Sequence, residues 1–262
     1  MQILLRANLL DCPGDPRLKR FFPAGGNLFK NLLEHCRQTG KAITFLRDMR
    51  WSPQHMQSAD AFLVARAQTL AQPQALLQRQ TIPTRSKWGE LVTYRASNLK
   101  ACPPPGSFRL LDQWTNELLA STDLDLSRLR GVQLVKAASG AIHVQVQQVL
   151  GPVAWDETML ETWDDGPAAP STPRHRGTLG YPAESLGGDW DLARTAEPFG
   201  CNRTGQLVVS RRFYQWWIAN GWKGLHFWPV WCERSPFIQE HRALWQDLMN
   251  QLKQFPRAEL WC

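Results

Sequence analysis

The hydrophobic pattern of this chain is clearest near its C-terminal end. An apolar run at residues 207–209 leads to Ser210, whose hydroxyl suits a helix N-cap. Aromatic residues then recur at helical spacing until Gly221, a residue type that favours the left-handed conformation of a helix C-cap. A second apolar run covers residues 224–231. The pattern therefore predicts a strand, a helix and a second strand in close succession.

The remaining elements follow from the same two periods, 3.6 residues for helices and two for strands. Ser139 and Gly140 separate two alternating runs, which predicts a hairpin over residues 131–150. Ser235 and Pro236 form a cap and first turn, and an apolar stripe after them predicts a terminal amphipathic helix. Elsewhere the pattern predicts strands over residues 3–10, 41–46 and 90–96, and helices over residues 27–40, 58–70, 74–80 and 107–120.

Residues 151–200 interrupt this regularity. They contain six prolines, seven glycines and a group of acidic residues, without a sustained period. A segment of that length without periodicity is usually a functional loop or disordered, and we expect a long, partly ordered loop. The fold class that follows is α+β, with a mixed or antiparallel sheet and packed helices. We expect a single domain over residues 1–262, with a possible division into residues 1–100 and 101–262.

The predicted strand–helix–strand segment also carries a recognisable motif. A strand ending in V-S-x-R-F precedes a short helix and then G-x-x-G-L-x-F-x-P-V. This segment resembles the C-terminal part of bacterial immunity proteins of polymorphic toxin systems, most closely the double-CXXCG motif immunity family. The matching residues are Val209, Ser210, Arg212, Phe213, Gly221, Gly224, Leu225, Phe227, Pro229 and Val230.

The resemblance implies a toxin-neutralising protein encoded beside its toxin. Neither CXXCG motif is present, so the zinc-ribbon-like sites that the family name implies are not carried over. We expect most of the motif residues to be structural, because glycine and proline at turns serve backbone geometry. This structural set comprises Ser210, Arg212, Phe213, Gly221, Gly224, Phe227 and Pro229.

Charge and aromatic content bear on possible partners. The net charge of +7 divides into +9 over residues 1–100, −6 over residues 101–197 and +4 over the remainder. The basic N-terminal part suits a nucleic-acid-binding surface, which is the alternative function. Against it, the basic residues form no tract and no nucleic-acid-binding motif occurs.

Most of the thirteen tryptophans should pack in the core, while a few could remain exposed as anchors for a protein partner.

Cysteine usage and hydropathy bear on the compartment. The six cysteines are widely scattered, and the first ten residues lack the long apolar core of a signal peptide. We therefore expect free thiols and a cytoplasmic protein. No apolar run approaches the length that spans a bilayer, so no membrane association is expected.

The sequence offers little for catalysis. It has no nucleophile elbow, phosphate-binding loop, dinucleotide-binding motif or metalloprotease helix. The pairs Asp164–Asp165 and Asp189–Asp191 could bind a cation or act as paired carboxylates, although acids in a Gly/Pro-rich loop are more often solubilising. We expect no enzyme activity, no cofactor and no metal, while chemistry assembled from distant residues stays open.

The resemblance, taken together with these observations, implies a cytoplasmic immunity protein that binds a cognate protein toxin and occludes it without catalysis. A few aromatic residues would provide contact area, and charged residues would set specificity and association rate. The acidic part of the 151–200 loop is the expected contact with a basic toxin surface. The candidate partner-binding residues are Asp156, Glu157, Glu161, Asp164 and Asp165. The sequence does not specify the toxin or the oligomeric state.

Overall fold

The computed structural model confirms an α+β fold that combines helices with mixed and antiparallel sheets. The residues that it describes are 1–9, 20–67, 78–82, 91–95, 103–112, 117–136, 141–154, 160–163, 172–175, 177–197, 205–255 and 258–261. The chain forms two compact units, each assembled from separate segments. Residues on both sides of position 100 belong to the second unit, so the border does not follow the division that the sequence suggested.

The first unit comprises Met1–Ala59, Ala154–Gly180 and Trp231–Cys262. Its main sheet has the order β17-β3-β1-β2, in which β17 is parallel to β3 and the other pairs are antiparallel. The strands are β1 (Gln2–Leu9), β2 (Phe22–Pro23), β3 (Ile43–Arg50) and β17 (Ala258–Trp261). A separate hairpin pairs β11 (Leu160–Trp163) with β12 (Thr172–His175).

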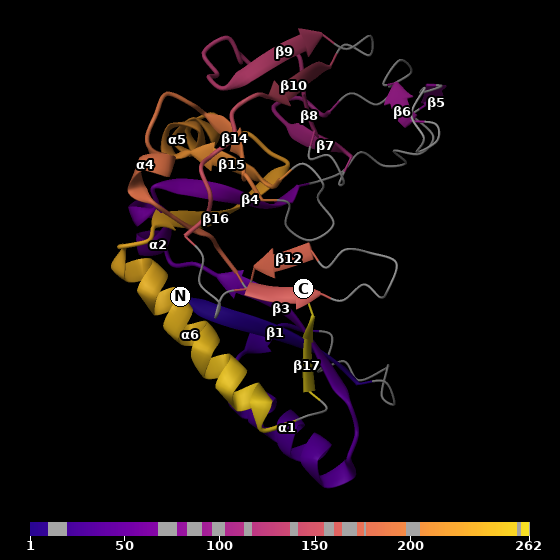
Figure 1. The fold of residues 1–262 in the computed structure, drawn as a ribbon, viewed down its shortest axis with the longest axis vertical. Coiled ribbons are helices and arrows are strands. Elements are labelled where there is room, and N and C mark those ends of the chain that lie inside the picture. The colour runs from indigo at the N-terminus through magenta and orange to yellow at the C-terminus, as the bar shows by residue number, and fades with distance from the viewer. Residues whose placement is uncertain are drawn as a thin grey trace. The chain divides into compact units, whose positions relative to one another are not determined.

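Helices cover one face of this main sheet. The described helices of the unit are α1 (Asn27–Thr39), α2 (Pro53–Ser58) and α6 (Pro236–Lys253) (Figure 1). Phe45 of β3 packs against Phe29 of α1, and Arg47, two residues further on the same face, lies over the ring of Trp245 in α6. The alternating burial of Ile3 and Leu5 on β1 completes the apolar face.

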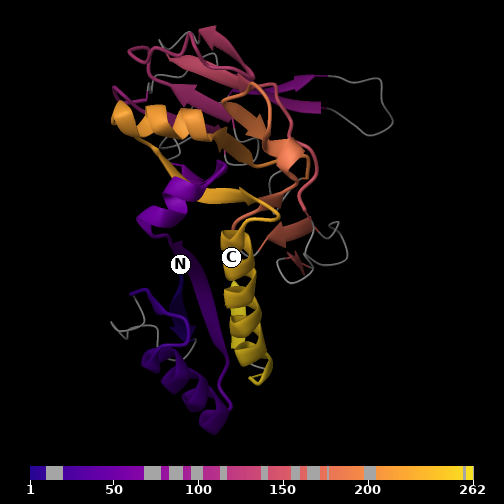
Figure 2. The same ribbon diagram turned by 90° about the vertical axis from the view of Figure 1, so that its left-hand side faces the viewer.

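The second unit comprises Asp60–Val153 and Tyr181–Val230. Its five-stranded sheet has the order β13-β16-β4-β15-β14, and α5 (Arg211–Ala219) connects β15 to β16. The strands are β4 (Ala61–Ala67), β13 (Gly180–Tyr181), β14 (Leu192–Arg194), β15 (Leu207–Ser210) and β16 (Leu225–Cys232). Since β15 and β16 both run antiparallel to β4, they are parallel to each other with β4 between them. Figure 2 shows α5 crossing from one to the other.

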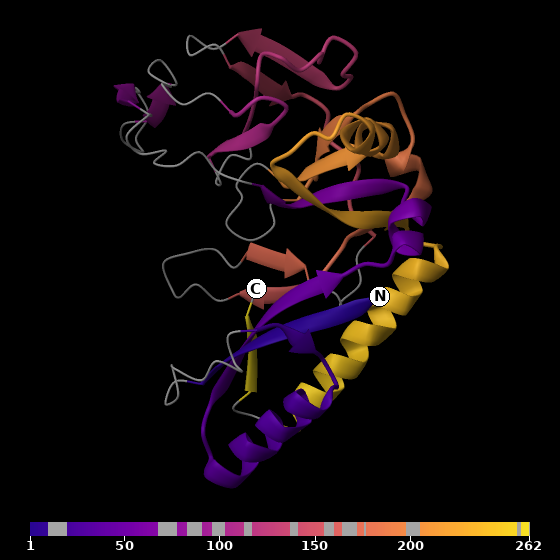
Figure 3. The same cartoon turned by 180° about the vertical axis from the view of Figure 1, so that it is seen from behind.

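A four-stranded antiparallel sheet completes the described core of the second unit. Its order is β7-β8-β10-β9, and the ring of Phe108 in β7 contacts Phe213 and Trp217 of α5. The strands are β7 (Phe108–Asp112), β8 (Glu117–Ala120), β9 (Val132–Lys136) and β10 (Ile142–Val146), and a separate hairpin is formed by β5 (Gln78–Ile82) and β6 (Leu91–Arg95). Figure 3 shows the four-stranded sheet from behind.

Three helices predicted from the sequence are wrong. Residues 58–70 and 107–120 contain β4 and the β7–β8 pair, and residues 78–80 of the predicted helix 74–80 lie in β5. The expected loop over residues 151–200 contains β11, β12, β13, β14 and the short helix α4 (Ala183–Leu186). Elements of two to four residues are too short to show a hydrophobic period, which explains why the pattern missed them.

Candidate protein-interaction site

Ser210 fixes the junction between β15 and α5. Its hydroxyl oxygen accepts the backbone N–H of Phe213 at 3.1 Å, which is the N-cap interaction that the sequence predicts. The same hydroxyl donates to Oδ1 of Asp191 at 3.1 Å. The cap is therefore connected to a carboxylate that lies 19 residues earlier in the chain.

Asp191 is the centre of this polar network. It is fully buried, and Arg212 binds it in a bidentate manner, with Nε 2.8 Å from Oδ1 and Nη2 2.7 Å from Oδ2. The backbone N–H of Arg130 donates to Oδ2 at 2.9 Å. The side-chain hydrogen bonds between Arg212 and Asp191 raise the pKa of Arg212. A buried carboxylate is tolerated when its oxygens are paired in this way.

Asp189 and Asp191, which the sequence suggested as a cation site or carboxylate pair, both face arginines. Asp189 contacts Nη1 of Arg130 and lies 3.8 Å from Nη1 of Arg212. Two guanidinium groups thus occupy the place that a cation would take. The arrangement holds the start of α5 and the segment before β9 together, and it leaves no carboxylate pair for acid–base chemistry at this point.

The motif glycines shape the turn between α5 and β16. Gly221 has a φ of 61° and Gly224 a φ of 103°, both in the region that glycine favours. A Cβ atom at Gly224 would overlap the carbonyl oxygen of Phe108. Next to it, the backbone carbonyl oxygen of Lys223 accepts the backbone N–H of Phe108 at 2.9 Å. Gly224 thereby allows the turn to lie directly against β7.

The apolar motif residues lie within the second unit. Phe213 is fully buried, and the ring of Phe227 lies 5.2 Å from that of Trp217. Pro229 is buried and opposite Phe62 of β4 in the strand register. These positions, together with the roles of Ser210 and Arg212, make this segment a framework for the second unit.

The acidic candidates are placed only in part. Glu161 lies in β11 of the first unit, opposite Arg174 of β12 in the register. Asp156, Glu157, Asp164 and Asp165 lie outside the described residues.

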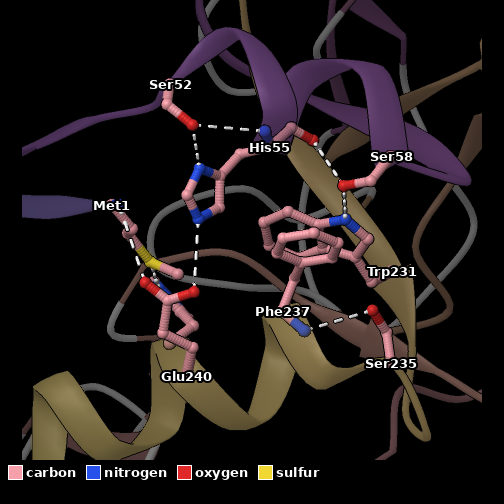
Figure 4. Close-up of polar contacts among 9 residues, drawn as sticks. Met1, Ser52, His55, Ser58, Trp231, Ser235, Phe237 and Glu240 are labelled. Atoms are coloured by element: carbon pink, nitrogen blue, oxygen red, sulfur yellow. Dashed lines mark hydrogen bonds and ion pairs between the residues drawn. The ribbon is translucent and has the colours of Figure 1, made fainter.

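A second polar cluster lies in the first unit, where Ser52, His55 and Glu240 meet (Figure 4). Ser52 caps α2, and its hydroxyl contacts Nδ1 of His55. Nε2 of His55 lies 3.4 Å from a carboxylate oxygen of Glu240 on α6. The order serine, histidine, carboxylate is that of a nucleophilic triad. In this cluster, however, the serine also accepts the amide of His55 at 3.4 Å.

The contacts around this cluster are those of a helix cap with a tertiary link. His55 occupies the third helical position, from which a side chain can reach back to the cap residue, as in a capping box. Trp231 donates from Nε1 to the hydroxyl of Ser58 at 3.2 Å, and its ring stacks on Phe237 (Figure 4). The cluster thus attaches α2 to α6. The sequence alone could not reveal it, because His55 and Glu240 are 185 residues apart.

Exposed apolar side chains in the described part of the chain are aliphatic or phenylalanine rather than tryptophan. Trp190, Trp217, Trp231 and Trp245 are buried, and the other four tryptophans with described side chains are half-buried. The large exposed residues are Phe21 in the first unit and Leu134, Val135, Val149 and Ile218 in the second. The described tryptophans therefore pack inside the protein, as the main expectation had it, and none of them is an exposed anchor.

The described residues contain no group of three or more His, Cys, Asp or Glu side chains that could hold a metal ion. In the same part of the chain, no helix has the length and apolarity needed to cross a membrane. Comparisons of the chain with protein-family models, curated proteins and solved structures found no match.

Proposed function

We propose that this chain is a cytoplasmic immunity protein that neutralises a cognate bacterial toxin by binding and occluding it. The observation that carries the proposal is the structural role of the residues that match the immunity-family motif. Its polar residues Ser210 and Arg212 converge on buried Asp191, and its glycines set the turn against β7. A motif that builds a rigid framework suits a protein whose activity depends on a preformed surface.

The polar clusters of the described residues favour the same interpretation. The carboxylates of Asp189 and Asp191 face arginines, and Ser52 and His55 are bound in a helix cap. Each cluster therefore has a structural explanation. The acidic residues Asp156, Glu157, Glu161, Asp164 and Asp165 stay the proposed contact with a basic toxin surface, where they would accelerate association electrostatically.

Co-expression with the protein encoded by the directly adjacent gene tests this function. The neighbour alone should arrest growth, and this chain should restore growth and be recovered with its neighbour in a pull-down. We expect the double variant Asp164→Lys with Asp165→Lys to protect less well, because it replaces attraction by repulsion at the proposed contact.

A matched control changes the net charge equally at exposed positions elsewhere, through Glu184→Lys with Asp247→Lys, and should protect as well as the wild type. Failure of the wild-type chain to restore growth would exclude the neighbour as its toxin and contradict the proposal. Equal protection by the wild type, the Asp164→Lys/Asp165→Lys variant and the control variant would contradict a toxin contact at these acidic residues.

A further inference from the structure

The main sheet of the first unit buries one face and leaves the other partly open. The side chains of Ile3, Leu5 and Phe45 point toward the helices and are buried. Neighbouring residues of a strand point to opposite faces, so the residues between these lie on the other side of β1 and β3 (Figure 1). These residues are half-buried or exposed and form the open face of the sheet: Gln2, Leu4 and Arg6 of β1, and Thr44, Leu46, Asp48 and Arg50 of β3.

An exposed aromatic ring lies on this open face beside β1. Phe21 is 40% exposed, and the guanidinium carbon of Arg6 lies 5.6 Å from the centre of its ring. The next residue, Phe22, points to the helix face of the sheet, where it packs against Phe45. The alternation therefore directs Phe21 to the open face. A guanidinium group over an aromatic ring forms a platform on which a further flat ring can stack.

The exposed arginines around this platform are not paired with carboxylates. Within the part of the chain that the structure describes, Arg6, Arg20 and Arg50 form no ion pair. By contrast, Arg37 on α1 pairs with Glu34 at 2.7 Å. The charges of the three arginines are therefore available to an anionic partner.

Asp48 is the one carboxylate among the described side chains of the open face. It lies opposite Leu4 in the register, and its Oδ1 accepts the backbone N–H of Met49 at 2.8 Å. Asp48 lowers the net charge of the face without binding Arg6 or Arg50. The exposed arginines thus outnumber the carboxylate, and the face favours an anion.

The spacing of these groups indicates the kind of anion. Arg50 lies opposite Gln2, which is four residues from Arg6 on β1, so the two arginines are about 13 Å apart along the strands. A nucleic acid carries a phosphate on every nucleotide and can meet both arginines, and the unstacked bases of a single strand can stack on Phe21. A duplex keeps its bases stacked on one another. Carboxylates of an acidic protein would meet the arginines but leave the aromatic platform without a function.

We propose that the open face of the first unit binds single-stranded nucleic acid. Phe21 and Arg6 would stack on an unpaired base, while Arg20 and Arg50 would contact phosphates. The sequence shows no basic tract because these residues are brought together only by the pairing of β1 with β2 and β3. The proposal does not rest on the proposed function, whose candidate toxin contacts are other residues.

Fluorescence anisotropy with labelled oligothymidylate and oligouridylate of about twelve nucleotides tests this surface. The wild type should bind both probes more tightly than a duplex of the same length, because only single strands expose the faces of their bases. Three phosphate contacts predict a roughly twentyfold loss of affinity between about 50 and 200 mM salt, a logarithmic slope of about −2.

Three variants and a charge control separate stacking from charge. Phe21→Ala should weaken binding of single strands at least about fivefold, whereas Phe21→Tyr should retain it. Arg50→Gln should weaken binding and make the salt slope shallower by about 0.7. Lys30→Gln removes the same charge from an exposed position on α1, which packs on the helix face of the sheet, and should leave the slope unchanged.

The proposal is overturned if neither oligonucleotide binds, if Phe21→Ala binds like the wild type, or if Lys30→Gln weakens binding as much as Arg50→Gln. Equal competition by polyglutamate at the same charge concentration would assign the face to an acidic protein and also overturn it. Thermal unfolding of each variant distinguishes lost binding from lost structure. Oligonucleotide binding combined with failed toxin protection would contradict only the proposed function.

Discussion

Asp191 and His241 are buried polar residues that the structure satisfies in different ways. Asp191 is a carboxylate balanced by Arg212, so removal of the arginine would leave an uncompensated buried charge. Nε2 of His241 accepts the amide of Thr178 at 3.1 Å and Nε1–H of Trp245 at 3.2 Å. That nitrogen must therefore be unprotonated, and the ring neutral, for both bonds to form.

Burial of His241 predicts a specific pH dependence of stability. Desolvation is the main cause, with nearby His175 and Arg242 next, and together they lower the pKa of His241 to about 3 from an ordinary value near 6.5. Between these values the unfolded chain binds the proton and the folded chain does not. The free energy of unfolding should therefore be greatest above about pH 6.5 and fall with acidification, by up to about 1.4 kcal/mol per pH unit from this residue.

Urea unfolding of the wild type and His241→Gln measures this effect between about pH 3.5, just above the lowered pKa, and about pH 7.5, above the ordinary pKa. Glutamine retains an oxygen acceptor for Thr178 but does not titrate. The stability difference between the two proteins should narrow as pH falls, while other titrating groups cancel in the comparison. Parallel pH profiles would show that His241 is not held neutral by the fold.

At the scale of elements, local signals predicted those structures whose determinants lie close together in the sequence. The β15–α5–β16 segment, the antiparallel β9–β10 pair and α6 were predicted correctly, because Ser210, the Ser139–Gly140 dipeptide of the sequence and Ser235 signal their boundaries. β4 was predicted as a helix, since it lies centrally in its sheet and buries consecutive residues instead of alternating ones.

The same reasoning explains the limits of site prediction. Arg212 and Ser210 were identified from their motif, but their partner Asp191 was assigned only a possible cation-binding or acid–base role. The contact of Arg130 with Asp191 joins residues 61 positions apart, and no local pattern encodes it. The open face of the first unit's main sheet likewise depends on strand pairing, which the local pattern does not determine.

The turn between α5 and β16 provides a direct test of how the motif glycines act. Gly224→Ala should destabilise the second unit by more than about 2 kcal/mol, because it combines an unfavourable φ with overlap of the Phe108 carbonyl oxygen. Gly221→Ala is the matched control, since its φ is also positive but no atom lies within 4 Å of the added Cβ. That variant should lose only about 1 kcal/mol. Equal losses in thermal or urea unfolding would contradict the packing role of Gly224.

At the scale of the whole molecule, the chain distributes its segments between two units. Residues 154–180 belong to the first unit and residues 181–230 to the second, so the proline- and glycine-rich region contributes to both. The β15–α5–β16 segment forms the framework of the second unit, where Ser210 is connected through Asp191 to Arg130 at the start of β9. In the proposed function, surfaces built on this framework bind the toxin and no bond in the toxin is made or broken.

Occlusion and catalysis differ in the amount of protein that they require. If the proposed function is right, the adjacent gene encodes the toxin, and the most direct measurement is a titration of its purified product, with the residual toxic activity followed as this chain is added. Binding by occlusion predicts a linear loss of activity that is complete only when the two proteins are present in comparable amounts. Complete inactivation by a small fraction of that amount would show turnover and contradict the account.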